Sequence, residues 1–168
     1  MKSQVFMICA SFIFLSNYSW GRSGIPNCYD NSHHEIPIDD EQVSRWEKTT
    51  PNQFLTRAHI QGVLTKVYQK KNRHMHFKID FRPYSTGTIE GIYNDEFGAL
   101  PVLHPGMLVE ACGDYITSTQ ATEKFPASPD GAIIHWIHEN PSKHGHPSGF
   151  LVIDGVVYGQ RNGYEISS

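Results

Sequence analysis

The sequence lacks most features that would assign a function directly. Its 168 residues contain no internal repeat and no low-complexity tract, and the length suits one domain. It has no Gly-rich phosphate loop, no Ser-centred nucleophile elbow and no paired-carboxylate signature, so nothing favours the hydrolases that use them. Beyond the first residues no segment is long and apolar enough to span a bilayer, which argues against a membrane-resident protein.

Positive charge is also in deficit. Lys and Arg number 14 against 17 Asp and Glu, a formal charge of −3, so sequence-independent attraction to polyphosphate should be weak. Most local basic clusters are only solvated surface. One cluster could nevertheless form a positive face, and it consists of Lys66, Lys70, Lys71, Arg73, Lys78 and Arg82.

The first 21 residues differ in kind from the rest. Lys2 gives a positive start, and residues 5–15 are almost wholly apolar but shorter than the roughly 20 residues that cross a bilayer. Ser19 and Gly21 place small residues at the minus-three and minus-one positions of a cleavage site. We expect residues 1–21 to be a signal peptide and the mature protein to be exported, to the periplasm or the medium. An N-terminal core helix is the alternative.

Cysteine usage fits an exported chain. Signal cleavage would remove Cys9 and leave Cys28 and Cys112 as an even pair in an oxidising compartment. A disulfide between them is one expectation. Two buried thiols that never meet are the other, because a sequence does not report the distance between two Cα atoms.

The mature chain is predicted to start with an irregular leader and a short helix, residues 22–50. Pro37 to Asp40 offers an N-cap, Val43 and Trp46 share one face, and Pro51 ends the helix over residues 40–48. From Pro51 the hydrophobic period becomes that of strands, and we assign residues 51–160 to a β domain and residues 161–168 to a tail.

The β domain is predicted to hold five principal strands and a terminal hairpin. Met75, Phe77 and Ile79 alternate with polar residues, which places one face of that strand in a core. Gly62 interrupts the first strand as a bulge or barrel bend would. The expected strands cover residues 54–68, 73–81, 88–94, 106–115 and 132–138, and the hairpin joins residues 150–153 to 156–158 through a primed turn.

This pattern predicts a mainly β fold, a small OB-like Greek-key β-barrel with a short N-terminal helix and a C-terminal hairpin. Closing the sheet would remove the exposed edges that five antiparallel strands otherwise carry. A β-sandwich is the alternative, because the helix comes before the strands and not between them.

Histidine is concentrated in residues 131–150, around an Asn-Pro turn. This stretch resembles the HWTHHDP and His-x-Gly-Gly signature of a bacterial family of small exported domains of unknown function, numbered three-four-six-five in that series. The resemblance covers most of the chain from about Gly62. The matching positions are His135-Trp136, His138, Pro141, His146 and Gly149, and upstream Arg73-His74, Asn94 and Gly113-Asp114-Tyr115.

Some positions depart from the family pattern. This chain has Ile137 where the family has Thr and Glu139-Asn140 where it has His-Asp, and an inserted residue adds His144. The loss of the acid before Pro141 puts any role of that carboxylate in doubt. The family name implies no activity, so the resemblance supports the fold and the positions of the site residues only.

Two kinds of chemistry fit these residues. His135, His138 and His146 could hold a divalent metal such as zinc, if the strand ends or twists so that residues three apart converge. Alternatively, histidines near a pKa of about 6.5 pass protons without a metal, while Arg73 binds an anionic group. We take His74, His135, His138 and His146 as candidate catalytic residues, and Arg73 and Asn94 as candidate substrate-binding residues.

Three functional interpretations remain open at this stage. One is a nuclease-like hydrolase that cleaves a phosphodiester in nucleic acid or in another anionic ligand. Another is a non-catalytic module that binds a metal, an oligosaccharide or nucleic acid. In the third, the histidines serve only structure.

Overall fold

The computed structural model describes residues 24–123, 125–142 and 144–160, so the expected signal peptide and tail lie outside the described residues. No helix in these ranges is long and apolar enough to cross a membrane. The elements in chain order are α1 Asp40–Thr49, β1 Leu55–Val67, β2 His74–Asp80, β3 Thr88–Asn94, the 3-10 turn η1 Asp95–Phe97, β4 Leu108–Thr117, β5 Ala132–His135, β6 Phe150–Ile153 and β7 Val156–Tyr158.

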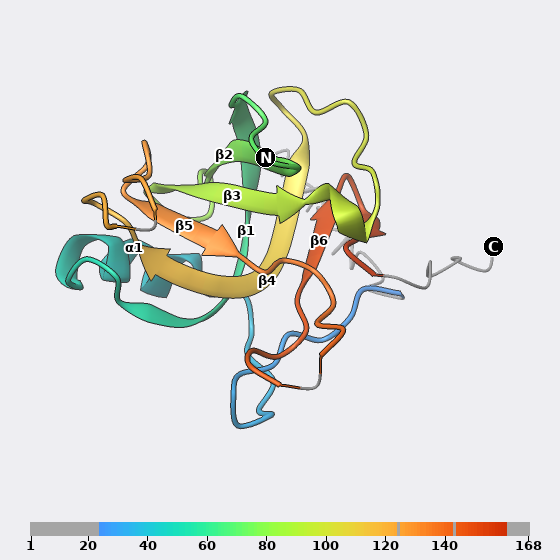
Figure 1. The fold of residues 1–168 in the computed structure, drawn as a ribbon, viewed down its shortest axis with the longest axis horizontal. Coiled ribbons are helices and arrows are strands. Elements are labelled where there is room, and N and C mark those ends of the chain that lie inside the picture. Colours follow the sequence, from blue (N-terminus) through green and yellow to red (C-terminus); the bar gives the residue numbers. More distant parts are fainter. Residues whose placement is uncertain (1–23, 124, 143, 161–168) are drawn as a thin grey trace, which may run out of the picture.

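The first five strands close into a barrel (Figure 1). They are ordered β1-β2-β3-β5-β4, and β4 pairs back with β1. β3 and β5 run parallel, with Glu90 opposite Ile133, while the other neighbours are antiparallel. The mainly β, OB-like barrel predicted from the sequence is confirmed, and closure excludes the sandwich.

β1 closes the barrel because it bends from one partner to the other. Residues 55–63 of β1 pair with β4, and residues from Val63 onward pair with β2. Gly62 lies at the change of partner, where a Cβ atom would be 2.5 Å from the carbonyl oxygen of Asp80. The register shift itself falls just after it, between Leu64 and Lys66. Glycine is therefore needed here for close approach of two strands.

Alternating apolar side chains fill the barrel, as the sequence predicts. Phe77 and Ile79 of β2 are fully buried, and they meet Tyr93 of β3 and Tyr115 of β4 in one core. Trp46 of α1 packs with its ring centroid 5.4 Å from that of Tyr115, so the helix covers the barrel at that point. The side chain of Asp39 caps the helix by accepting from the amide of Gln42.

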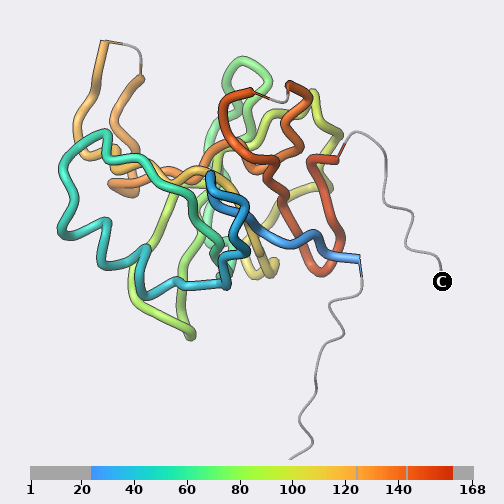
Figure 2. Tube along the Cα trace, turned by 90° about the horizontal axis from the view of Figure 1, so that it is seen from below, coloured from blue at the N-terminus to red at the C-terminus, as the bar shows by residue number. Residues whose placement is uncertain are grey.

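The leader buries more than its composition suggests. Cys28 forms a disulfide with Cys112 of β4, with 5.6 Å between the Cα atoms. Cys28 also joins a second small core with Phe150 and Val152 of β6, against which Ile25 and Ile36 pack. Figure 2 shows the leader, in blue, running beside the red C-terminal hairpin. The disulfide thus fixes the leader on the hairpin side of the barrel.

Removing the disulfide should destabilise the protein by about 2–4 kcal/mol, because the bond restricts the unfolded chain over a long loop. The test is urea denaturation of the Cys28→Ser, Cys112→Ser double variant beside the wild type. A reducing agent should lower the wild-type midpoint and leave that of the double variant unchanged. Equal midpoints for the two oxidised proteins would contradict this prediction.

The strand expected over residues 132–138 ends early, at His135. Trp136 has a φ of 51°, a left-handed conformation that no strand continues through. The hairpin, in contrast, forms as predicted, because Asp154 and Gly155 both have positive φ, as a type I′ turn requires.

Candidate functional site

The end of β5 carries the candidate site. In a continuous strand, His135 and His138 would face opposite sides of the sheet, because they are three residues apart. The strand ends at His135 and the chain turns at Trp136, so this restriction does not apply to His138. Two glycines let this segment lie tightly against its neighbours. A Cβ atom at Gly113 would collide with the carbonyl oxygen of His135, and one at Gly149 would collide with that of Trp136.

The structure brings the four candidate histidines together. His74, at the start of β2, lies with its ring centroid 5.7 Å from that of His135, at the end of β5. Trp136 stacks beside His135 at 4.5 Å and lies 5.1 Å from His146. His146 is 6.3 Å from His138, which stacks on Phe97 at 3.7 Å. We call this series the ring row: His74, His135, Trp136, His146, His138 and Phe97.

Backbone carbonyls set the tautomer of three histidines in the ring row. In each, Nδ1 lies 2.8–2.9 Å from the carbonyl oxygen of a residue one or two positions away. A carbonyl oxygen only accepts hydrogen bonds, so Nδ1 must carry the hydrogen, and a neutral ring then has its lone pair on Nε2. The three residues are His74, His138 and His146.

His135 differs from these three. Its ring is half-buried and makes no hydrogen bond to any other described residue. Burial, followed by the nearby positive charge of other histidines, lowers the pKa of His135 to about 3; in order of effect these are His74, His138, His76 and His146. His135 is therefore a neutral imidazole at physiological pH and is able to accept a proton.

The lowered pKa of His135 should make acid destabilise the protein. The pKa of His135 is about 3 in the folded protein and about 6.5 in the unfolded chain. The unfolded chain therefore binds a proton first as the pH falls, so His135 costs no stability above pH 6.5 and costs progressively more as the pH falls towards 3. Between about pH 7 and about pH 4.5, His135→Gln should lose about 2 kcal/mol less stability than the wild type. Urea denaturation at both pH values measures this, with the exposed His104→Gln as control. Equal losses in all three proteins would contradict the prediction.

The ring row does not form the metal-ligand set considered from the sequence. A shared metal ion would hold the imidazoles of His135 and His146 around itself. Instead, the indole of Trp136 contacts both of these rings. Among the described residues, no three His, Cys, Asp or Glu side chains are placed to hold a metal ion. The geometry therefore gives the zinc hypothesis, with His135, His138 and His146 as ligands, no support.

The side chains of Arg73 and Asn94 both interact with residues of η1, which follows β3. The exposed guanidinium of Arg73 pairs with Asp95 at 3.1 Å and with Glu96 at 3.6 Å, which raises the pKa of Arg73 and balances its charge. The side chain of Asn94 accepts from the amide of Glu96 and caps η1. Lys70 also pairs with Asp95. Arg73 is thus already paired with two carboxylates, and an anionic ligand would have to compete with them for the guanidinium.

A buried ion pair behind the histidines was not found from the sequence. Asp114 lies opposite His135 in the β4–β5 ladder, and Arg57 of β1 binds it with 2.8 Å between Nη1 and Oδ1. Arg57 also donates to the backbone carbonyls of Tyr29 in the leader and Ser148 in the β5–β6 loop. One side chain therefore joins the leader, the barrel and the histidine loop. No local pattern marks such a role, because all its partners are distant in sequence.

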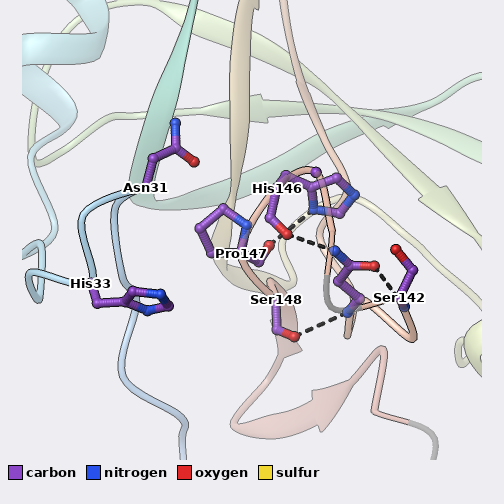
Figure 3. Close-up of a pocket in the computed structure, with 8 residues that line it drawn as sticks. Asn31, His33, Ser142, His146, Pro147 and Ser148 are labelled. Carbon is purple, nitrogen blue, oxygen red and sulfur yellow. Dashed lines mark hydrogen bonds between the residues drawn. The ribbon is translucent and has the colours of Figure 1, made fainter.

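An open pocket of about 550 Å³ lies between the leader and the β5–β6 loop (Figure 3). The amide of Asn140 shapes the loop side by donating to the carbonyls of His144 and His146. An ionised aspartate at this position could not make these bonds, because it has no hydrogen to donate. The pocket is lined by Asn31, His33, Asn140, Ser142, Gly145, His146, Pro147 and Ser148, so it shares His146 with the ring row.

In comparisons with known proteins, no protein-family model, curated protein or solved structure matches the chain.

Proposed function

We propose that the protein is a nuclease-like enzyme that cleaves phosphodiesters by acid–base catalysis at His74 and His135. The observation that carries this proposal is the pairing of the two rings, 5.7 Å apart, from strands far apart in sequence. Two positioned imidazoles are enough to take a proton from an attacking oxygen and to give one to the leaving oxygen. Such proton transfer contributes about 10²–10⁴-fold to a rate.

The two histidines suit different parts of that reaction. His135 is neutral, has no hydrogen-bond partner among the described residues and is the natural proton acceptor. A bound phosphodiester would add negative charge beside the ring and raise the pKa of His135 towards neutrality, where a base works best. His74 has Nδ1 held by the carbonyl of Asn72, so in the protonated ring Nε2 is left to donate the second proton.

The ring row also favours a second candidate function, a nucleic-acid-binding module without catalysis. Trp136 and Phe97 give the row aromatic faces beside the imidazoles, and bases stack on such surfaces with little sequence preference. Strands β2 and β3 form the face that OB-type barrels use for such ligands; His74 starts β2, and Phe97 lies in η1, directly after β3. A module of this kind would retain nucleic acid and release no products.

Turnover in the presence of a chelator separates these functions. The purified protein would be incubated with labelled RNA, DNA and cyclic nucleotides in EDTA, and products would be resolved by electrophoresis or chromatography. Cleavage in EDTA supports the proposal. Retention without products favours the binding module, and cleavage that EDTA abolishes and zinc restores overturns the metal-free mechanism.

We also propose that the protein is exported, on the basis of Lys2, the short apolar run and the small residues at Ser19 and Gly21. The intact mass of protein recovered from the periplasm or the medium should correspond to a chain that begins near residue 22. A species that still begins at Met1 would contradict this.

A further inference from the structure

The ring row provides proton transfer but no nucleophile of its own. Cleaving a phosphodiester requires an attacking oxygen, supplied by a metal-bound water, by a side chain or by the substrate. In the described part of the chain, neither His74 nor His135 hydrogen-bonds a serine, threonine, cysteine or carboxylate. Nor do the described residues place three ligand side chains for a metal ion. Both mature cysteines, Cys28 and Cys112, are consumed in the disulfide.

We infer that the attacking oxygen belongs to the substrate, which makes the substrate RNA and its 2′-hydroxyl the nucleophile. This inference rests on the proposed function, because it assigns a substrate to the same pair of histidines. A neighbouring hydroxyl in the same molecule needs no separate binding step. Well-oriented intramolecular groups reach effective concentrations of about 10⁵–10⁸ M. DNA offers no such oxygen.

The reaction balances with the two imidazoles alone. Neutral His135 removes the proton of the 2′-hydroxyl while the 2′-oxygen forms a bond to phosphorus. The bond from phosphorus to the 5′-oxygen breaks, and protonated His74 gives its Nε2 proton to that oxygen. The products are a 2′,3′-cyclic phosphate and a 5′-hydroxyl, no water is consumed, and the two rings have exchanged protonation states. Proton exchange with solvent restores both histidines.

The surroundings of the pair fit a single strand of RNA. Trp136 stacks directly beside His135 and continues the row of aromatic rings, so a base next to the scissile phosphate would pack against that row. The two cations Lys70 and Arg73 near His74 are balanced by two carboxylates, because both pair with Asp95 and Arg73 also pairs with Glu96. Binding should therefore depend more on stacking than on phosphate contacts, and its salt dependence should be shallow.

An oligonucleotide with one ribonucleotide tests the inference. The protein is assayed in EDTA against a DNA strand with a single internal ribonucleotide, the same strand with 2′-O-methyl at that position, and the all-DNA strand. We expect cleavage only after the ribonucleotide, at least about 100-fold faster than in either control strand. The new 3′ end should have the mass of a cyclic phosphate, lighter than a linear phosphate by one water.

The outcomes separate the two levels of the proposal. Cleavage of all-DNA at a comparable rate, or products with a 5′-phosphate, overturns the RNA inference and leaves phosphodiester cleavage standing. No cleavage of any strand, with RNA also intact, overturns the proposed function itself. His135→Ala purified in the same way should cleave the ribonucleotide strand at least about 100-fold more slowly, and undiminished cleavage by this variant overturns the assignment of His135 as the base. His104→Ala, an exposed histidine outside the ring row, must match the wild type.

Discussion

Replacing His135 by alanine should lower kcat/KM for phosphodiester cleavage by about 10²–10⁴-fold, because it removes the proposed base. The ring makes no hydrogen bond to other described residues and is half-buried, so the barrel should remain folded. His74→Ala should have an effect of the same order through loss of the acid. The double variant should be little worse than either single variant, since the two groups act in one step.

Two other histidines serve as controls for this prediction. His104 is exposed and has Nδ1 near the carbonyl of Pro105, as His74 has near that of Asn72, but it lies outside the ring row. His104→Ala should keep full activity. His138 is buried and stacked on Phe97, so His138→Ala should lower stability as well as activity. Circular dichroism and urea denaturation report folding beside the kinetics. A folded His135→Ala protein with wild-type kcat/KM would end the acid–base proposal.

Replacing Arg57 by methionine should destabilise the protein by about 3–5 kcal/mol, since it leaves the charge of Asp114 buried and unpaired. The side chains of Arg57 and Asp114 are only 2% and 9% exposed, and their nearest atoms are 2.8 Å apart. The substitution also removes the donors to the carbonyls of Tyr29 and Ser148. The leader and the histidine loop should therefore loosen together, and hydrogen exchange should increase in both.

A surface arginine provides the matched control. Arg45 of α1 pairs with Glu41, and the two side chains are 58% and 75% exposed, so Arg45→Met should change the urea midpoint little. Adding Asp114→Leu to Arg57→Met should recover part of the lost stability, because no buried charge then remains. If Arg57→Met destabilised no more than Arg45→Met, the ion pair would not be holding these segments together.

Local chemistry predicted most of the fold. Alternation of Met75, Phe77 and Ile79 identified β2, and the Asp154-Gly155 pair identified the hairpin, because both signals involve only neighbouring residues. The prediction for β5 extended three residues too far. The strand ends where Trp136 takes a positive φ, and a tryptophan in the sequence gives no signal for that backbone conformation.

The sequence by itself determined the strands, the turn residues and the histidine-rich stretch around the Asn-Pro turn, since short-range patterns fix these. Only the tertiary structure decided which histidines meet. Closure of the barrel brings the start of β2 beside the end of β5, so His74 meets His135 across strands that are remote in the chain. It also placed Trp136 between the rings of His135 and His146, and it buried Arg57 against Asp114, which lies opposite His135 in the β4–β5 ladder. Distances between side chains on different strands depend on register and closure, and no local pattern encodes them.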